Sequence, residues 1–275
     1  MLLIRSTLFN IAFFGWLILC CVFLAWTALL PRDRMMEWVR WVLRGVSFLE
    51  RHIAGIEYEV IGLEKLPTKG SYIVAAKHQS AWETMKLHVI LGDPAVVLKK
   101  ELTQVPVWGL AARKSRMIPV DRSARGRAIS SLLEGAAAIA VEGRPIVIFP
   151  QGTRVAPGAV EPYKAGVALM YNKLKLPMVP MALNSGVFWG RKAYFKRPGK
   201  ITVQFFDPIP AGLPRDEAMA RLEKVLEAES DRLVRMGRAC RTPPLPRNPS
   251  NPLSPPNPSP RKVRAFSAEV DTGSA

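Results

Sequence analysis

The chain has 275 residues, which is long enough for one large domain or for one domain with appendages. Its formal net charge of +17 predicts an anionic partner, such as nucleic acid, an anionic lipid surface or a phosphorylated small molecule. The sequence has no zinc-finger spacing, RNA-binding aromatic signature or basic zipper, so no nucleic-acid partner is predicted. The three cysteines, Cys20, Cys21 and Cys240, predict neither a disulfide framework nor a metal site.

Residues 8–30 form an apolar stretch, LFNIAFFGWLILCCVFLAWTALL, without an ionised side chain. At about 1.5 Å per residue, a helix of this length spans the roughly 30 Å hydrocarbon core of a membrane. A cleaved signal peptide, with Arg5 as its charged start, is the competing interpretation. The stretch is too long and too aromatic for that role, and it ends at Pro31 and Arg32 without a small-residue cleavage site. We therefore predict a membrane anchor.

Residues 35–53 carry apolar side chains at helical spacing, with arginines among them. One interpretation is an interfacial helix beside the anchor, and another is an amphipathic helix packed on the following domain. In a third, both helices lie as a pair partly within one leaflet. Arg32, Arg34 and Arg40 follow the anchor, so the positive-inside rule favours a cytosolic position for the rest of the chain. We expect the bacterial inner (cytoplasmic) membrane, with the following domain on its cytosolic side.

From residue 56 to 240, strand-like and helix-like patterns alternate, which predicts an α/β fold with a mixed, largely parallel sheet flanked by helices. The expected strands are residues 57–61, 71–76, 95–98, 117–120, 145–149, 178–183 and 201–205. The expected helices are residues 80–91, 123–141, 165–174 and 214–236. We divide the chain into a membrane-anchoring helical pair (1–55), an α/β domain (56–240) and a Pro-rich tail (241–275). The tail has too few apolar residues to offset its ordering entropy, so we expect disorder.

The segment KHQSAWET, residues 77–84, lies between an expected strand and an expected helix. His78 and Glu83 are five positions apart and would diverge by about 140° on one continuous helix, so a turn must separate them if they meet. With Ser80 as N-cap, the segment Ser80 to Glu83 is a capping box, and the two side chains converge. In one interpretation Glu83 orients His78 as a general base. In the other, Glu83 only caps the helix.

Two further segments carry cations beside apolar runs. KKELTQVPVWGLAARKSRMIPVDR, residues 99–122, contains Lys100, Arg116 and Arg122, each either a phosphate ligand or a solvated charge. IFPQGTR, residues 148–154, runs from a strand into Gln151, Gly152, Thr153 and Arg154. Gly152 permits a tight turn whose N–H groups, hydroxyl and guanidinium can converge on a phosphate. A fourth segment, LPMVPMALNSG, predicts a strand.

The segments KHQSAWE, KKEL with MIPVDR, FPQGTR and VPMAL occur in the order of the four motifs of the glycerolipid acyltransferases. Between residues 56 and 206 the chain resembles the 1-acyl-sn-glycerol-3-phosphate acyltransferase (lysophospholipid acyltransferase) family in particular. The expected helical pair is similar to that family's membrane anchor. Two positions depart from the family pattern, because Glu83 stands where Asp is usual and Gln151 stands where Glu is usual.

The resemblance implies a catalytic dyad of His78 and Glu83. It places the phosphate-binding positions at Arg154, Thr153, Gly152 and Gln151, and also at Lys100 and Arg122. It implies an acyl-coenzyme A or acyl carrier protein thioester as co-substrate, with no further cofactor and no metal. His78 would deprotonate the acceptor hydroxyl during attack on the thioester, and backbone N–H groups near the helix start could stabilise the oxyanion.

The expected reaction is acyl transfer to 1-acyl-sn-glycerol-3-phosphate, giving phosphatidic acid in phospholipid biosynthesis. The expected partners are lysophosphatidic acid, the acyl thioester and membrane lipids. One alternative is a related acyltransferase with another lyso-lipid acceptor, such as lyso-ornithine lipid. The others are a catalytically inactive membrane lipid-binding protein and a lysophospholipid hydrolase.

Overall fold

The computed structural model describes residues 1–27, 29–121, 123–124 and 126–240, which lie within one compact unit. The expected tail, 241–275, lies outside the described residues. The strands are β1 (Ile56–Ile61), β2 (Ile73–Ala76), β3 (Ala95–Lys99), β4 (Ile118–Val120), β5 (Ile146–Ile148), β6 (Met178–Leu183) and β7 (Gly199–Phe205). The helices are α1 (Leu2–Thr27), α2 (Arg32–Leu49), α3 (Trp82–Ile90), α4 (Trp108–Lys114), α5 (Gly126–Val141), α6 (Ala165–Leu174), α7 (Ser185–Phe188) and α8 (Arg215–Ala239). Short 3₁₀ turns lie at η2 (Leu63–Lys65) and η3 (Lys100–Gln104), and a π-helical turn, η1 (Glu50–Ala54), follows α2.

The seven strands form one sheet in the order β1-β7-β6-β2-β5-β3-β4. Every neighbouring pair is parallel except β6 and β7, which are antiparallel. The central strands β2 and β6 are buried along their whole length, as expected for strands covered by helices on both faces. The predicted fold class, a mixed and largely parallel sheet flanked by helices, is confirmed.

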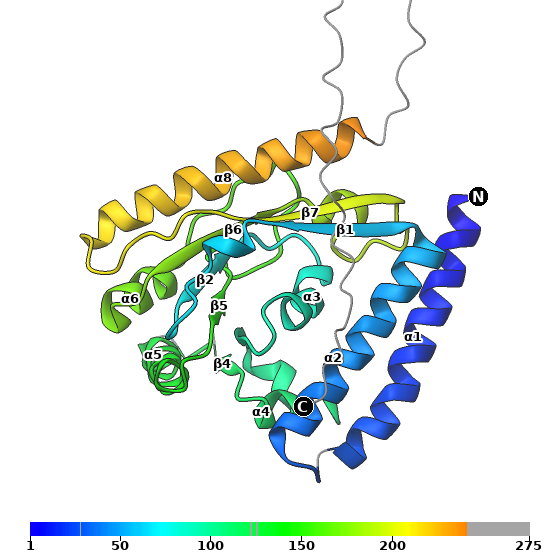
Figure 1. Ribbon diagram of the computed structural model, residues 1–275, viewed down its shortest axis with the longest axis horizontal. Coiled ribbons are helices and arrows are strands. Elements are labelled where there is room, and N and C mark those ends of the chain that lie inside the picture. Colours follow the sequence, from blue (N-terminus) through cyan, green and yellow to red (C-terminus); the bar gives the residue numbers. More distant parts are fainter. Residues whose placement is uncertain (28, 122, 125, 241–275) are drawn as a thin grey trace, which may run out of the picture. The chain divides into compact units, whose positions relative to one another are not determined.

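Helices cover both faces of the sheet, as Figure 1 shows. Side chains of β2 alternate between the two resulting cores. Val74 and Ala76 belong to the core shared with α1, α2 and α3, whereas Ile73 and Ala75 belong to the core shared with α5, α6 and α8. The carboxyl ends of the parallel strands β2 and β5 meet at one edge of the sheet, where loops leave towards α3 and α6.

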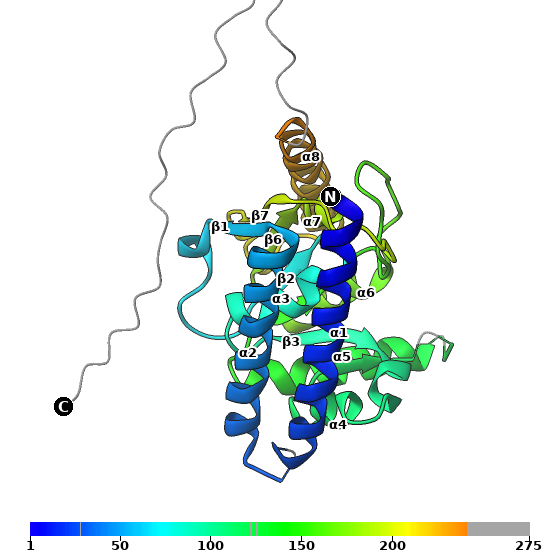
Figure 2. The same cartoon turned by 90° about the vertical axis from the view of Figure 1, so that its right-hand side faces the viewer.

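The helices α1 and α2 form an antiparallel hairpin (Figure 2). The Trp16 indole donates a hydrogen bond to the Val42 carbonyl (3.0 Å) and packs against Trp41. Helix α1 begins six residues before the predicted stretch, and Arg5, inside this added part, donates to the Ile53 carbonyl (3.0 Å). Within the described residues, one helical segment, Leu2–Phe23, is long and apolar enough to cross a membrane.

Helix α2 buries Met35, Met36, Leu43 and Val46 and packs against both α1 and α3. At its carboxyl end, the buried Glu50 carboxylate pairs with the Lys86 ammonium (2.6 Å) and accepts from the Trp82 indole (3.2 Å), both on α3. Burial raises the pKa of Glu50 and lowers that of Lys86. The helical pair is therefore tied to the helix that carries Glu83.

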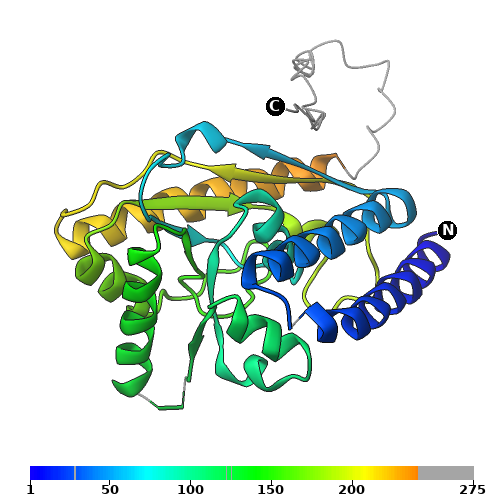
Figure 3. The same cartoon turned by 60° about the horizontal axis from the view of Figure 1, so that its bottom comes forward.

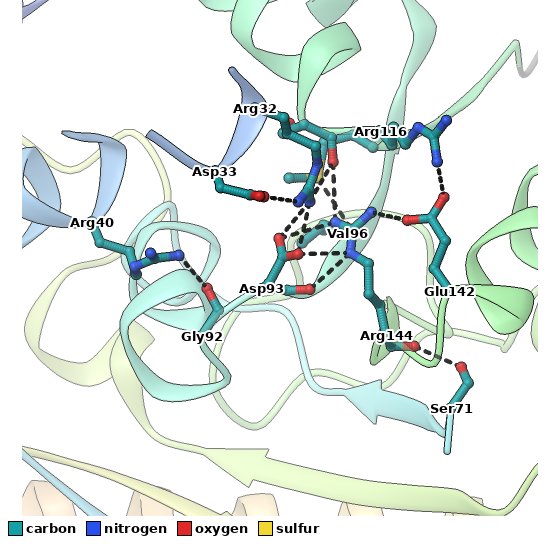
Figure 4. A network of polar contacts seen from close by, with 12 residues as sticks. Arg32, Asp33, Arg40, Ser71, Gly92, Asp93, Val96, Arg116, Glu142 and Arg144 are labelled. Carbon is teal, nitrogen blue, oxygen red and sulfur yellow. Dashed lines mark hydrogen bonds and ion pairs between the residues drawn. The ribbon is translucent and has the colours of Figure 1, made fainter. Parts of the chain in front are cut away.

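The amino end of α2 is held by a second polar network, drawn in Figure 4. The Asp93 carboxylate, in the loop after α3, accepts from Arg32 (2.6 and 2.8 Å) and from Arg144 (3.0 Å). Arg144 also pairs with Glu142 (3.1 Å), and Glu142 contacts Arg116. The network fixes the start of α2 against the loops that precede β3 and β5.

Candidate active site

His78 and Glu83 meet at the start of α3. The His78 Nδ1 atom lies 2.8 Å from Glu83 Oε1, and the two side chains are 12% and 1% exposed. Because a carboxylate can only accept, Nδ1 carries the hydrogen and Nε2 is left as an acceptor. The second Glu83 oxygen accepts from the Ser185 hydroxyl (2.7 Å), at the start of α7. Glu83 is therefore held from two sides while it orients the imidazole.

Glu83 also caps the turn. The backbone N–H groups of Gln79 (2.7 Å) and Ser80 (2.6 Å) both donate to Glu83 Oε1, and the Ser80 hydroxyl accepts from the Trp82 N–H (3.1 Å). The helix begins at Trp82 with Ala81 as N-cap, one residue later than the expected cap at Ser80. Capping and contact with His78 thus coexist. The N–H groups of Gln79, Ser80 and Trp82 are thus engaged inside the protein and do not face a substrate oxygen.

The loop after β5 supports His78. The imidazole stacks on the Phe149 ring with centroids 3.9 Å apart, and the Val155 N–H donates to the His78 carbonyl (2.8 Å). Gly152 has φ +67°, the left-handed conformation that a tight turn requires, and its N–H donates to the Phe149 carbonyl (2.8 Å). The segments KHQSAWE and FPQGTR, widely separated in sequence, therefore build one site.

A cavity of about 990 Å³ opens beside His78. Gly152, Thr153 and Arg154 line it together with the imidazole. Its cationic lining side chains are Lys99, Arg154, Lys164, Arg191 and Lys192, and no carboxylate lines it among the residues that the structure describes. Apolar side chains from the helical pair and the domain line the remainder, including Leu17, Val39, Met85, Leu102, Trp108 and Leu132. Figure 3 shows the courses of α2 (blue), α4 (teal-green) and α5 (green), the helices that carry the lining residues Val39, Trp108 and Leu132.

The comparisons with known proteins agree with this geometry. The acyltransferase family model matches residues 57–184. The 1-acyl-sn-glycerol-3-phosphate acyltransferase of Pseudomonas aeruginosa is 34% identical over 194 residues, which cover 70% of this chain and 74% of that protein. The chain belongs to the 1-acyl-sn-glycerol-3-phosphate acyltransferase family. The family prediction is thereby confirmed.

Two further relatives of this acyltransferase chain extend the comparison. The mouse 1-acyl-sn-glycerol-3-phosphate acyltransferase alpha is 29% identical over 221 residues, 79% of this chain and 77% of the relative. The crystal structure of the 1-acyl-sn-glycerophosphate (LPA) acyltransferase PlsC from Thermotoga maritima superposes with a TM-score of 0.68. The superposition covers 85% of this chain and 99% of the Thermotoga chain. The two sequences are 19% identical, so this comparison supports the fold alone.

Gln151, which departs from the family pattern, does not face the cavity of this acyltransferase. Its side chain is buried, and its amide donates to Glu227 Oε1 on α8 (3.5 Å). The same carboxylate pairs with the Lys77 ammonium (2.5 Å) and accepts from the Tyr163 hydroxyl (2.9 Å). Burial, together with the Glu227 charge, raises the pKa of Tyr163, so the phenol stays a donor. Glu227 thus supplies the carboxylate at this position, and a glutamate in place of Gln151 would put two acids side by side.

Segment 99–122 contributes Lys99, Leu102 and Trp108 to the cavity lining, but its predicted phosphate ligands Lys100 and Arg116 are not among the described lining residues. The Lys100 ammonium pairs with Asp121 (3.2 Å), whose pKa is lowered to about 2 by hydrogen bonds from Ser123 and Lys100. Lys100 is about half exposed and is not among the described lining residues. Arg116 pairs with Glu142, and Arg122 lies outside the described residues.

Sequence reasoning missed Ser185, Glu227, Lys164 and Arg191. Ser185 lies 102 positions from its partner Glu83, and Glu227 lies 150 positions from its partner Lys77. Ser185 lies in the segment LPMVPMALNSG, which predicted only a strand, and the other three stand in no local pattern that distinguishes them from other polar residues. The one available signal for Lys164 and Arg191 was the excess of basic residues in the whole chain.

Proposed function

We propose that this chain transfers an acyl group from an acyl thioester to the free hydroxyl of 1-acyl-sn-glycerol-3-phosphate, giving phosphatidic acid. The observation that carries the proposal is the cavity itself. It joins the His78–Glu83 pair to a cationic region without a described carboxylate and to a long apolar region. An acceptor with a phosphate, a hydroxyl and an acyl chain has the chemistry that these three parts require.

His78 acts as general base. Its Nε2 accepts the proton of the acceptor hydroxyl as that oxygen attacks the thioester carbonyl, so that a C–O bond forms. The C–S bond then breaks, and the imidazolium returns the proton to the departing thiolate. Glu83 holds the other ring nitrogen at 2.8 Å and stabilises the positive charge that develops on the ring. The reaction consumes no redox equivalent and passes through no acyl-enzyme.

Arg154 and Thr153 bind the acceptor phosphate, and the Gly152 turn presents them in the cavity that also contains His78. Gln151 keeps this turn in place through Glu227 and Lys77. The acyl chains occupy the apolar part of the cavity. The volume of the whole cavity, about 990 Å³, lies within the range of about 300–1,000 Å³ typical of ligand pockets. Acyl-coenzyme A or acyl carrier protein supplies the thioester.

Helix α1 attaches the protein to a membrane, which we propose to be the bacterial inner membrane with the α/β domain on its cytosolic side. One face of α1 exposes large apolar side chains, including Leu8, Ile11, Phe14, Ile18 and Val22. Deleting α1 would also remove Phe9 and Phe13 from the core. The sharper test is therefore Ile18→Asp, 67% exposed in the wild type, which should reduce flotation with anionic vesicles while the thermal midpoint stays unchanged.

The experiment that tests the proposal uses purified protein in detergent with 1-acyl-sn-glycerol-3-phosphate and acyl-coenzyme A. Mass spectrometry should show phosphatidic acid and free coenzyme A in equal amounts. Release of free fatty acid without diacyl product would support a hydrolase. A diacyl product formed solely from a lyso-lipid with another head group would assign a different acceptor, and absence of turnover with every acceptor would support the inactive lipid-binding alternative.

A further inference from the structure

Three of the cations that line the cavity, Lys164, Arg191 and Lys192, come from outside the four sequence motifs. Arg191 and Lys192 belong to the segment between α7 and β7, residues 189–198, which we call the α7–β7 loop. Both side chains are exposed, and both line the cavity that also contains His78 and Arg154. Core packing does not account for Arg191 and Lys192, because exposed cationic side chains contribute little to it.

The α7–β7 loop is attached directly to the phosphate-binding turn. The Arg191 guanidinium donates to the Arg154 carbonyl (3.3 Å), which brings it next to the second arginine of the cavity lining. Lys192 has φ +54°, a left-handed conformation that is uncommon for a lysine. Such strain persists when the surrounding structure fixes the backbone, so the loop has a defined conformation.

Buried contacts hold the base of this loop. The Lys196 side chain is 5% exposed, and its ammonium donates to the carbonyls of Ala193 (2.6 Å) and Tyr194 (3.1 Å). The same ammonium lies 5.1 Å from the centre of the Trp189 ring. Burial lowers the pKa of Lys196. The loop is therefore closed on itself by a desolvated cation that cannot serve as a ligand in the cavity.

Helix α1 holds the outside of the loop. The Ser6 hydroxyl accepts from the Lys196 N–H (3.1 Å), and the Asn10 amide donates to the Tyr194 carbonyl (3.1 Å). Phe9 packs edge-on against Trp189 at 5.3 Å. The membrane-anchoring helix is thus coupled to the loop that carries Arg191.

We propose that Arg191, assisted by Lys192, binds the acceptor phosphate together with Arg154, and that α1 positions the loop for this purpose. The inference rests on the proposed function. A phosphate monoester carries about −1.5 to −2 charges near pH 7 and three acceptor oxygens, more than one guanidinium satisfies. Arg191 supplies a second guanidinium from a different loop, in a lining without a described carboxylate.

The test compares Arg191→Gln and Arg191→Lys with Arg197→Gln, a matched control. Arg197 lies on the same loop, is exposed and is not among the described residues that line the cavity. Arg191→Gln should raise the KM for 1-acyl-sn-glycerol-3-phosphate about 10- to 100-fold, as expected for loss of a hydrogen-bonded charge pair. Arg191→Lys should give a smaller rise, and Arg197→Gln should behave as wild type. The donor KM should stay within about twofold for all three.

Three results would overturn the inference. An unchanged acceptor KM would mean that Arg191 does not bind substrate, and a raised donor KM alone would assign it to the donor's phosphates. Equal loss with a monoacylglycerol acceptor, together with a lower thermal midpoint, would mean that Arg191 only fastens the loop.

Asn10→Leu should raise the acceptor KM but not the donor KM, if α1 positions the loop. A wild-type protein that makes no phosphatidic acid would refute the proposed function, whereas active wild type with insensitive variants would refute this inference alone.

Discussion

The Glu83→Gln substitution separates the two roles of this side chain. In the wild type, Glu83 Oε1 accepts from His78 Nδ1 and from the N–H groups of Gln79 and Ser80, and Oε2 accepts from the Ser185 hydroxyl. Because two backbone donors face the Oε1 position, the introduced amide must place its oxygen there and its nitrogen towards Ser185, whose hydroxyl can also accept. The cap and the His78 tautomer are therefore preserved, and only the negative charge is lost.

The expected loss of turnover follows from that geometry. Hydrogen bonds to charged groups are worth about 1.5–3 kcal/mol, so loss of the charge opposite a developing imidazolium should lower kcat about 10- to 150-fold. Substitutions that also reverse the imidazole tautomer reach losses of about four orders of magnitude. Here the two backbone donors prevent that reversal. The acceptor KM should change little, because Glu83 is not one of the described residues that line the cavity.

The assay is the initial rate of phosphatidic acid formation at saturating acceptor and donor, with Glu64→Gln, an exposed position, as control. The double variant His78→Ala, Glu83→Gln should be no slower than His78→Ala alone, because the two residues act as a unit. Wild-type turnover of Glu83→Gln would refute the reasoning and leave Glu83 as a cap. A loss as large as that of His78→Ala would mean that the amide does not keep the ring in place.

Three further predictions concern the phosphate turn, the buried carboxylate and acid stability. Arg154→Lys should raise the acceptor KM at least about tenfold, because lysine cannot reproduce the bidentate fork, with no effect on a phosphate-free acceptor. Glu227→Gln leaves the Lys77 ammonium buried without a carboxylate and should lower the free energy of unfolding by about 3 kcal/mol, measured by denaturant titration. In the Glu227→Gln protein, adding Gln151→Glu should restore most of the lost free energy of unfolding. Failure to restore it would contradict the idea that Glu227 supplies the carboxylate that the family carries at position 151. Burial lowers the pKa of His88 to about 4; nearby arginines lower this pKa further, whereas Asp93 raises it. Between about pH 6.5 and about pH 4 the unfolded state binds a proton that the folded state does not, so stability falls as the pH falls, by at most about 3 kcal/mol. Denaturant titrations of His88→Gln should show a shallower loss over this window.

The strands and the catalytic segment could be predicted because their signals are local. Apolar runs marked every strand, and β6 coincides with the expected 178–183. The convergence of His78 and Glu83 followed from capping geometry within one short segment. Helix α4 was not predicted, because it is short and begins after Val107, whose positive φ of 60° is unusual for a β-branched residue. The antiparallel pairing of β7 with β6 likewise depends on contacts between strands.

The rest of the site could not be predicted, because it depends on contacts between distant residues. Lys77 and Glu227 are 150 positions apart, and the carboxylate on α8 explains why the turn after β5 carries Gln151. Sequence comparison with the family pattern marked Gln151 as a departure but gave no indication of its compensating acid. The cation Arg191 is one of many in a basic chain, and only the fold brings it to Arg154. Lys100, chosen from its motif, pairs with Asp121 and is not among the described residues that line the cavity.

The most direct test of the central claim is the rate at which His78→Ala forms phosphatidic acid from 1-acyl-sn-glycerol-3-phosphate and acyl-coenzyme A. The variant should lose about two to four orders of magnitude in kcat, the range expected for a positioned general base. Its thermal midpoint should remain near that of the wild type, since the imidazole lies partly exposed at the cavity wall. A folded His78→Ala protein that forms phosphatidic acid at the wild-type rate would contradict the account.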